Sequence, residues 1–226
     1  MKRFKAVLVS AAVCASGAAL ANSTISGTIA FTGTPPAAEP LKRNSDPVCA
    51  KKQMNDESVL VKDGKLANVV VRLTNAPAGK APEAPVVIDQ TDCMYRPRVV
   101  VAVEGQKVEV KNSDGTLHNV HSYAGSKTLF NQAQPPKSSP IVKEIKADAD
   151  VVKLKCDVHP WMTGWVAFSK SPYFAVTGED GKFELKNVPP GKYTLEAWHE
   201  KLGTQTAEVT VGDNKTAEVK LSFAAK

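Results

Sequence analysis

The sequence has few of the features that mark several common protein classes. It contains only 4 cysteines, 4 histidines and 4 methionines among 226 residues, whereas proteins that hand over metal ions usually carry Met- or His-rich segments. It has no Gly-x-Ser-x-Gly nucleophile elbow, no Cys-x-x-Cys-His haem motif and no paired carboxylates in a recognisable catalytic frame. A hydrolase and a haem protein are therefore disfavoured, and we expect no enzymatic activity.

Long apolar runs are also missing, except at the N-terminus. A charged start and an apolar stretch over residues 6–20 precede an Ala-Leu-Ala sequence that ends at Ala21. This pattern is typical of a cleaved signal peptide, residues 1–21, and is too short to span a bilayer. A lipoprotein would use Cys14, but Val13 before it is larger than that signal requires. We therefore predict a periplasmic protein that does not span the membrane.

Arginine-rich patches are missing as well. Three of the basic residues, Lys2, Arg3 and Lys5, leave with the signal, which lowers the formal net charge from +6 to +3. The remaining lysines are spread along the chain. This weak, dispersed positive charge does not indicate a nucleic-acid partner.

The mature chain is dominated by alternating apolar and polar residues, as in 108–111, 152–156 and 183–185. Such alternation predicts half-buried strands of antiparallel sheets, and Gly- and Pro-rich turns separate the runs. One short helix is predicted from Val48 to about Asn55, with Ser45 or Asp46 as its N-cap. The expected fold class is all-β, built from β-sandwiches.

The stretch from Lys155 to Val166 combines three soft metal donors. Cys156, His159 and Met162 offer a thiolate, an imidazole and a thioether within seven residues. A blue-copper site uses two His, one Cys and a weak axial Met, so one further His is required. The alternative is that Cys156 is a small buried hydrophobe, His159 a surface residue and Met162 core filling.

His118 and His121 are the two candidates for the second histidine ligand. Side chains alternate along a strand, so these two histidines point to opposite faces. His118 shares its face with Val120, and it meets Cys156 if the two strands are neighbours. A zinc site with both histidines is the weaker alternative, because alternation places His121 at the surface or behind the ligands.

The cysteine count then predicts a disulfide. Once Cys14 leaves with the signal, Cys49, Cys93 and Cys156 remain. An oxidising compartment favours pairing of two of them, and Cys156 belongs to the metal-ligand set. We therefore predict a Cys49–Cys93 disulfide; the alternative is a pair of buried thiols.

Three segments together resemble the cupredoxin family, in particular amicyanin- and plastocyanin-like blue copper proteins. They are PRVVVAVEGQKVEVKN (97–112), LHNVHSYAG (117–125) and CDVHPWM (156–162). The resemblance implies one type 1 copper ion held by His118, Cys156, His159 and Met162. It also implies that Asn119 braces the ligand loops, although Asp157 stands where the family usually has Ser or Thr.

A second resemblance covers the C-terminal part. The Gly-x-Phe-x-Leu and Val-Pro-Pro-Gly-x-Tyr-x-Leu pattern within 171–223 resembles carboxypeptidase regulatory-like, or transthyretin-like, β-sandwiches. The strands that usually open such a module occur earlier, at 25–36 and 67–73. We therefore predict a Greek-key cupredoxin sandwich inserted in this second sandwich between Leu73 and Ser171; three serial pieces packed together are the alternative.

The predicted division of the chain follows from these two resemblances: signal peptide, 1–21; N-terminal strands of the accessory sandwich with the short helix, 22–85; cupredoxin domain, 86–170; regulatory-like strands, 171–226.

The predicted function is that of a periplasmic type 1 copper protein that carries single electrons. In cupredoxins the edge of the second histidine reaches the surface in an apolar patch. Here Val158, Pro160 and Trp161 would surround His159, and redox proteins of the cytochrome or dehydrogenase type would dock near His159 and Trp161. A copper storage, delivery or sensing protein is the main alternative, and a structural or adhesive β-sandwich protein is the second.

Overall fold

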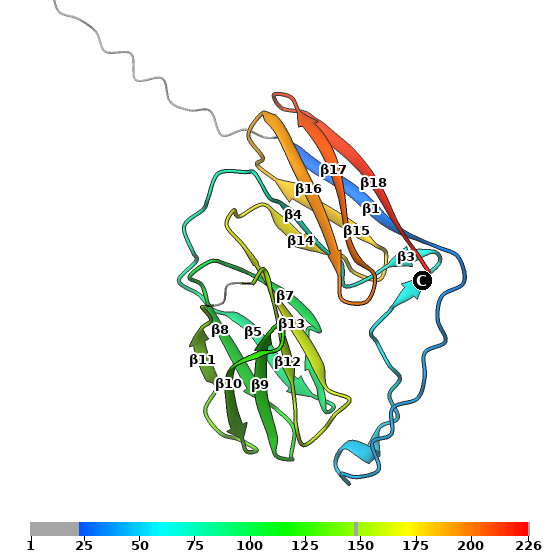
Figure 1. The fold of residues 1–226 in the computed structure, drawn as a ribbon, viewed down its shortest axis with the longest axis vertical. Coiled ribbons are helices and arrows are strands. Elements are labelled where there is room, and N and C mark those ends of the chain that lie inside the picture. Colours follow the sequence, from blue (N-terminus) through cyan, green and yellow to red (C-terminus); the bar gives the residue numbers. More distant parts are fainter. Residues whose placement is uncertain (1–22, 147–148, 226) are drawn as a thin grey trace, which may run out of the picture.

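The structure is a computed structural model that describes residues 23–146 and 149–225. The predicted signal peptide lies outside these residues. Within them, two β-sandwiches contain the regular structure, and one turn of 3₁₀-helix is the only helical element (Figure 1). No helix in this part of the chain is long and apolar enough to cross a membrane. The predicted all-β fold class is confirmed.

The accessory sandwich consists of two sheets whose strands come from both ends of the chain. In the first sheet, β1 (Thr24–Thr32) lies at the centre and pairs with β15, β3 and, in parallel, β18. Its other strands are β2 (Val61–Lys62), β3 (Lys65–Leu66), β15 (Lys182–Lys186) and β18 (Thr216–Ala224). The second sheet has the order β14-β4-β16-β17. Its strands are β4 (Val70–Leu73), β14 (Phe174–Val176), β16 (Gly191–His199) and β17 (Gly203–Val211).

The second sandwich lies between β4 and β14 in the chain and occupies the lower part of Figure 1. One of its sheets has the order β10-β9-β12-β13-β7. These strands are β7 (Val99–Val103), β9 (His118–Ala124), β10 (Lys127–Gln134), β12 (Val151–Lys155) and β13 (Thr163–Ser169). The facing sheet has the order β11-β8-β5-β6. These strands are β5 (Val86–Thr91), β6 (Met94–Arg96), β8 (Lys107–Asn112) and β11 (Ile141–Glu144).

The chain leaves the accessory sandwich after β4 and returns to it at β14, which pairs antiparallel with β4 through Ala175 and Val71. The central sandwich is therefore an insertion between two paired strands. Each sandwich has its own apolar core, as the alternating strands require. A third, smaller cluster of Val70, Val99, Val101 and Ala167 packs between the two sandwiches.

A long connection joins β1 to β2, and we refer to residues 33–60 as the strap. It leaves the accessory sandwich and runs beside the inserted one (Figure 1). The disulfide between Cys49 and Cys93, with a Cα–Cα distance of 5.7 Å, attaches the strap to the turn between β5 and β6. The predicted disulfide is confirmed.

The predicted helix from Val48 to Asn55 is wrong, because only Cys49–Lys51 forms a 3₁₀ turn, η1. The N-cap position is Val48 and not Asp46. Oδ1 of Asp46 nevertheless accepts hydrogen bonds from the backbone N–H groups of Val48 (2.7 Å) and Cys49 (3.1 Å). At Lys52 the backbone is already extended, with φ −128°, and its carbonyl accepts a hydrogen bond from Arg43 (2.7 Å). The helical turn therefore ends at Lys51.

Candidate metal centre

Two neighbouring strands bring His118 and Cys156 together at one end of the inserted sandwich. His118 is the first residue of β9, and Cys156 directly follows β12. These strands are antiparallel, with Leu154 opposite Ser122 and Lys155 opposite His121. The start of one strand therefore lies beside the end of the other, and alternation directs both side chains inward. His159 follows in the loop after Cys156.

The three side chains place their donor atoms in a triangle. Nδ1 of His118 and Nδ1 of His159 are 2.8 Å apart, and Sγ of Cys156 lies 3.9 and 3.7 Å from them. A point in the plane of these atoms lies about 2 Å from all three, close to the roughly 2.0–2.3 Å of zinc bonds to imidazole nitrogen and thiolate sulfur. All three residues are fully buried, with 0% exposure. The donor set and spacing fit a trigonal metal site.

Met162 is also fully buried, in the same apolar cluster as Cys156. Its N–H donates a hydrogen bond to the carbonyl of His159 (2.9 Å), which closes the tight turn of the loop. Its role as an axial ligand stays a prediction. His121 lies on the other face of β9, where its Nδ1 is 3.0 Å from Oδ2 of Asp157.

The brace expected from Asn119 is present. Its side chain accepts a hydrogen bond from the N–H of Asp157 (2.7 Å) and donates one to the Asp157 carboxylate (2.9 Å). Its backbone N–H points at Sγ of Cys156 at 3.5 Å. Asp157 thus completes the connection between the two ligand segments that Ser or Thr would otherwise make. The hydroxyl of Tyr95 adds a further link, since it donates towards the carbonyls of Asn119 (3.1 Å) and Lys155 (3.0 Å).

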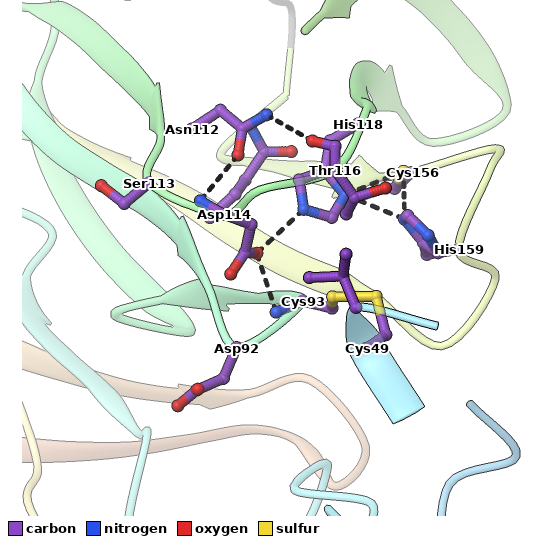
Figure 2. A network of polar contacts seen from close by, with 12 residues as sticks. Cys49, Asp92, Cys93, Asn112, Ser113, Asp114, Thr116, His118, Cys156 and His159 are labelled. Atoms are coloured by element: carbon purple, nitrogen blue, oxygen red, sulfur yellow. Dashed lines mark hydrogen bonds and ion pairs between the residues drawn. A yellow bond between two sulfur atoms is a disulfide. The ribbon is translucent and has the colours of Figure 1, made fainter. Parts of the chain in front are cut away.

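Two carboxylates that the sequence analysis did not identify contact the far edges of the histidine rings. Oδ2 of Asp114 lies 2.9 Å from Nε2 of His118, and Oδ2 of Asp46 lies 3.1 Å from Nε2 of His159. Figure 2 shows Asp114 beneath His118, with the Cys49–Cys93 disulfide below both imidazoles. The sequence could have indicated Asp114, because it lies four residues before the proposed ligand His118. Nothing in the sequence indicated that Asp46 contacts His159.

His159 is covered, which contradicts the expectation that its edge reaches the surface. Its exposure is 0%, and the strap supplies the Asp46 carboxylate at its outer nitrogen. Its ring also packs against Trp161, with ring centroids 5.0 Å apart. Trp161 is half-buried, and its indole N–H donates to the carbonyl of Cys93 (3.1 Å). Of the predicted patch, Val158 and Pro160 remain exposed.

The electrostatics of the centre favour a thiolate. Burial raises the pKa of Cys156, but hydrogen bonds from His118, His159 and the backbone outweigh it and lower the pKa to about 6. Burial lowers the pKa of His118, but the Asp114 carboxylate and the Cys156 thiolate raise it to about 8. For Asp46, burial opposes ionisation, yet hydrogen bonds from Thr116, the backbone and His159 bring the pKa well below its usual value. Cys156 is therefore held as a buried thiolate beside the two histidines.

These features define an all-β protein with two joined sandwiches, one of which encloses a Cys-His-His set at one end. Residues 166–224 match the family model of the carboxypeptidase regulatory-like domain. A comparison with curated proteins gives no match. The resemblance of the C-terminal strands to the regulatory-like family is thus confirmed.

Solved structures of cupredoxins match as well. A purple cupredoxin from Nitrosopumilus maritimus is 24% identical, and the match covers 37% of this chain and 99% of that one, with a TM-score of 0.33. A mutant amicyanin in its oxidised state is 19% identical over 44% of this chain and 98% of that one, with a TM-score of 0.34. A copper-containing nitrite reductase from Thermus scotoductus is 19% identical over 42% of this chain but only 24% of its own length, with a TM-score of 0.34. The predicted resemblance to cupredoxins is therefore confirmed.

Proposed function

We propose that the protein is a type 1 copper protein that carries single electrons between redox partners in the periplasm. The observation that supports this most is the buried triangle of Cys156 Sγ and the Nδ1 atoms of His118 and His159. Thiolate, imidazole and thioether donors suit copper, and two His with one Cys and a weak axial Met are the blue-copper arrangement.

In this proposal His118, Cys156 and His159 hold the metal strongly, and Met162 is the weak axial ligand. Copper would supply a one-electron couple. The protein would hold the donors in one geometry in both oxidation states, so that little rearranges when an electron moves. The Asn119–Asp157 brace supports this role, because it fixes the two ligand segments to each other.

The signal-like N-terminus supports the periplasmic location, and the apolar surface near the centre supports the docking of redox partners. Redox partners, of the cytochrome or dehydrogenase type, would dock where Val158 is 47% and Leu117 43% exposed. These apolar side chains directly neighbour His159 and His118 in the chain. Small apolar surfaces suit the weak interfaces of redox encounters, typically below about 1,200 Å².

Copper storage, delivery or sensing is the alternative function. Metal transfer between proteins requires that a second set of ligands reach the ion. Here all four proposed ligands are 0% exposed and the strap covers His159, which favours a retained metal. The same burial leaves no open position for a substrate, so we propose that the protein is not an enzyme.

The test is an optical and EPR titration of the mature protein with one equivalent of Cu(II), with Cys156→Ala alongside. We expect an intense thiolate-to-copper band that disappears in the variant, because Cys156 is the free cysteine among residues 23–146 and 149–225. His121→Gln is the matched control, since this nearby histidine lies on the opposite face and should leave the band in place. A pale spectrum in the wild type would refute the type 1 site.

A second readout separates the carrier from the delivery protein. Copper that stays bound through repeated reduction and oxidation in the presence of a Cu(I) chelator supports electron transfer. Rapid loss of Cu(I) to the chelator would instead support delivery or storage.

A further inference from the structure

Both histidines of the centre are held at their outer nitrogens by carboxylates. Asp46 is 15% exposed and Asp114 10% exposed at the side chain, so solvent screens these contacts only weakly. An ionised carboxylate only accepts hydrogen bonds, and each Nε2 must therefore carry the ring proton. In the metal-free site the two Nδ1 atoms and Cys156 Sγ share hydrogen bonds, and metal binding would displace those protons. Because Nε2 keeps the ring proton, both Nδ1 atoms could then bind the metal. Such outer contacts orient metal-binding histidines and raise their basicity.

The two carboxylates come from different parts of the chain. Asp114 belongs to the inserted sandwich, four residues before His118. Asp46 belongs to the strap, 113 residues from His159. The ring of His159 is therefore positioned by a segment that is no part of the sandwich that supplies the ligands.

Asp46 is itself fixed in place. Its Oδ1 accepts the two backbone N–H groups at η1, and its Oδ2 accepts the hydroxyl of Thr116 (2.6 Å). The disulfide ties the next turn of the strap to Cys93. Figure 2 shows the disulfide below both histidines. The disulfide sulfur of Cys49 lies within 4.8 Å of a carboxylate oxygen of Asp46 and a ring nitrogen of His159, and that of Cys93 lies as close to Asp114 and His118.

The negative charges around the centre favour Cu(II) over Cu(I). With a metal bound, the imidazoles would be neutral, and the centre would contain the Cys156 thiolate and, directly behind the rings, two carboxylates. Negative charges at this distance in a buried site stabilise Cu(II) more than Cu(I). They also oppose rotation of His159 away from the metal, because its Nε2–H would lose its acceptor in a buried place.

We propose that Asp46 is a positioning residue of the copper centre: it holds His159 as a ligand in both oxidation states and biases the centre towards Cu(II). This inference rests on the proposed function. It assigns to the strap a specific task, which is to present one carboxylate to one ligand ring.

The experiment compares Asp46→Asn with the wild type and with Asp63→Asn. Asp63 lies exposed in the β2–β3 turn, so this control removes the same charge far from the centre, and Asn tolerates its φ of 49°. Loss of such an outer contact typically costs about 10- to 100-fold in metal affinity. We expect at least a tenfold loss of Cu(II) affinity relative to Cu(I). For a one-electron couple, each tenfold is a rise in reduction potential of about 59 mV.

A readout on the metal-free protein tests the hydrogen bond directly. In ¹⁵N-labelled wild type, a slowly exchanging Nε2–H signal of His159 should be present. It should be lost or exchange rapidly in Asp46→Asn and persist in Asp63→Asn. The double variant Cys49→Ser/Cys93→Ser keeps Asp46 but unties the strap, and we expect it to shift the potential in the same direction as Asp46→Asn.

The outcomes distinguish this inference from the proposed function. A wild type without the intense Cu(II) band refutes the proposed function and the inference with it. A blue wild type whose potential and Nε2–H signal are the same in Asp46→Asn and Asp63→Asn refutes the inference alone. Unchanged thermal unfolding of metal-free Asp46→Asn, together with a raised potential, supports it and excludes misfolding as the cause.

Discussion

The ion pair between Arg98 and Glu200 joins the two sandwiches, and breaking it should destabilise the whole chain. Arg98 precedes β7 in the inserted sandwich, and Glu200 follows β16 in the accessory one. Two guanidinium nitrogens contact the two carboxylate oxygens, with Nη2 at 3.0 Å from Oε2. Their side chains are only 6% and 3% exposed. Removing one partner would leave the other charged, buried and unpaired.

The expected size of this effect follows from that burial. Glu200→Gln should lower the free energy of unfolding by about 3–5 kcal/mol. At a urea dependence of about 2 kcal/mol per molar, the midpoint should move down by roughly 2 M. Tryptophan fluorescence can follow the transition, because Trp165 and Trp198 face each other across the same interface with ring centroids 5.4 Å apart.

Two further variants test whether the loss of stability comes from a buried charge that has lost its partner. The double variant Arg98→Met/Glu200→Leu should recover most of the loss, since apolar replacement of a buried ion pair is often neutral. Glu179→Gln breaks an exposed pair, in which the side chains of Lys62 and Glu179 are 65% and 71% exposed, and should leave the urea midpoint nearly unchanged. If Glu200→Gln costs no more than Glu179→Gln, the ion pair does not couple the sandwiches.

Two predictions concern stability of the metal-free protein. Cys49→Ser/Cys93→Ser removes a link across a sequence separation of 44 residues and should cost about 4 kcal/mol; an unchanged denaturation midpoint would contradict a structural role. Burial lowers the pKa of His199 to about 4. Between about pH 4 and pH 6.5 the unfolded chain therefore binds more protons than the folded one. The free energy of unfolding should decrease as the pH is lowered through this window, by about 2 kcal/mol at pH 5. His199→Gln should remove that part of the pH dependence, measured by urea titration at pH 7 and pH 5; an identical slope in both proteins would exclude it.

Local patterns were sufficient to predict the strands and to place three of the four proposed ligands near one another. Alternation placed His118 and Cys156 on inward faces, and the short spacing after Cys156 placed His159 and Met162 in one loop. Each of these inferences needs only neighbouring residues and the assumption that two strands pair. The structure brings three of the four side chains into one triangle for that reason.

Contacts between distant segments were not predictable in the same way. The contact of Asp46 with the start of η1 was predictable locally, but its Oδ2 is aimed at His159, 113 residues away. The burial of His159 depends on the same contact, so the expectation of an exposed edge was wrong. The predicted helix was wrong because the backbone is extended from Lys52, whose carbonyl accepts a hydrogen bond from Arg43 and not from a helical N–H group.

The topology explains why the accessory sandwich and the centre belong to one unit. Both ends of the strap, at β1 and β2, are strands of the accessory sandwich, whereas its middle is bonded to Cys93 beside the ligands. The position of Asp46 therefore depends on how the two sandwiches sit against each other. The buried Arg98–Glu200 pair and the Trp165–Trp198 contact fix that arrangement. A loss of this interface should consequently move the carboxylate behind His159 as well as lower stability. The reduction potential of Glu200→Gln under native conditions is the measurement that connects the two effects: it should rise towards that of Asp46→Asn, and a potential equal to the wild type would show that the strap keeps its place without the interface.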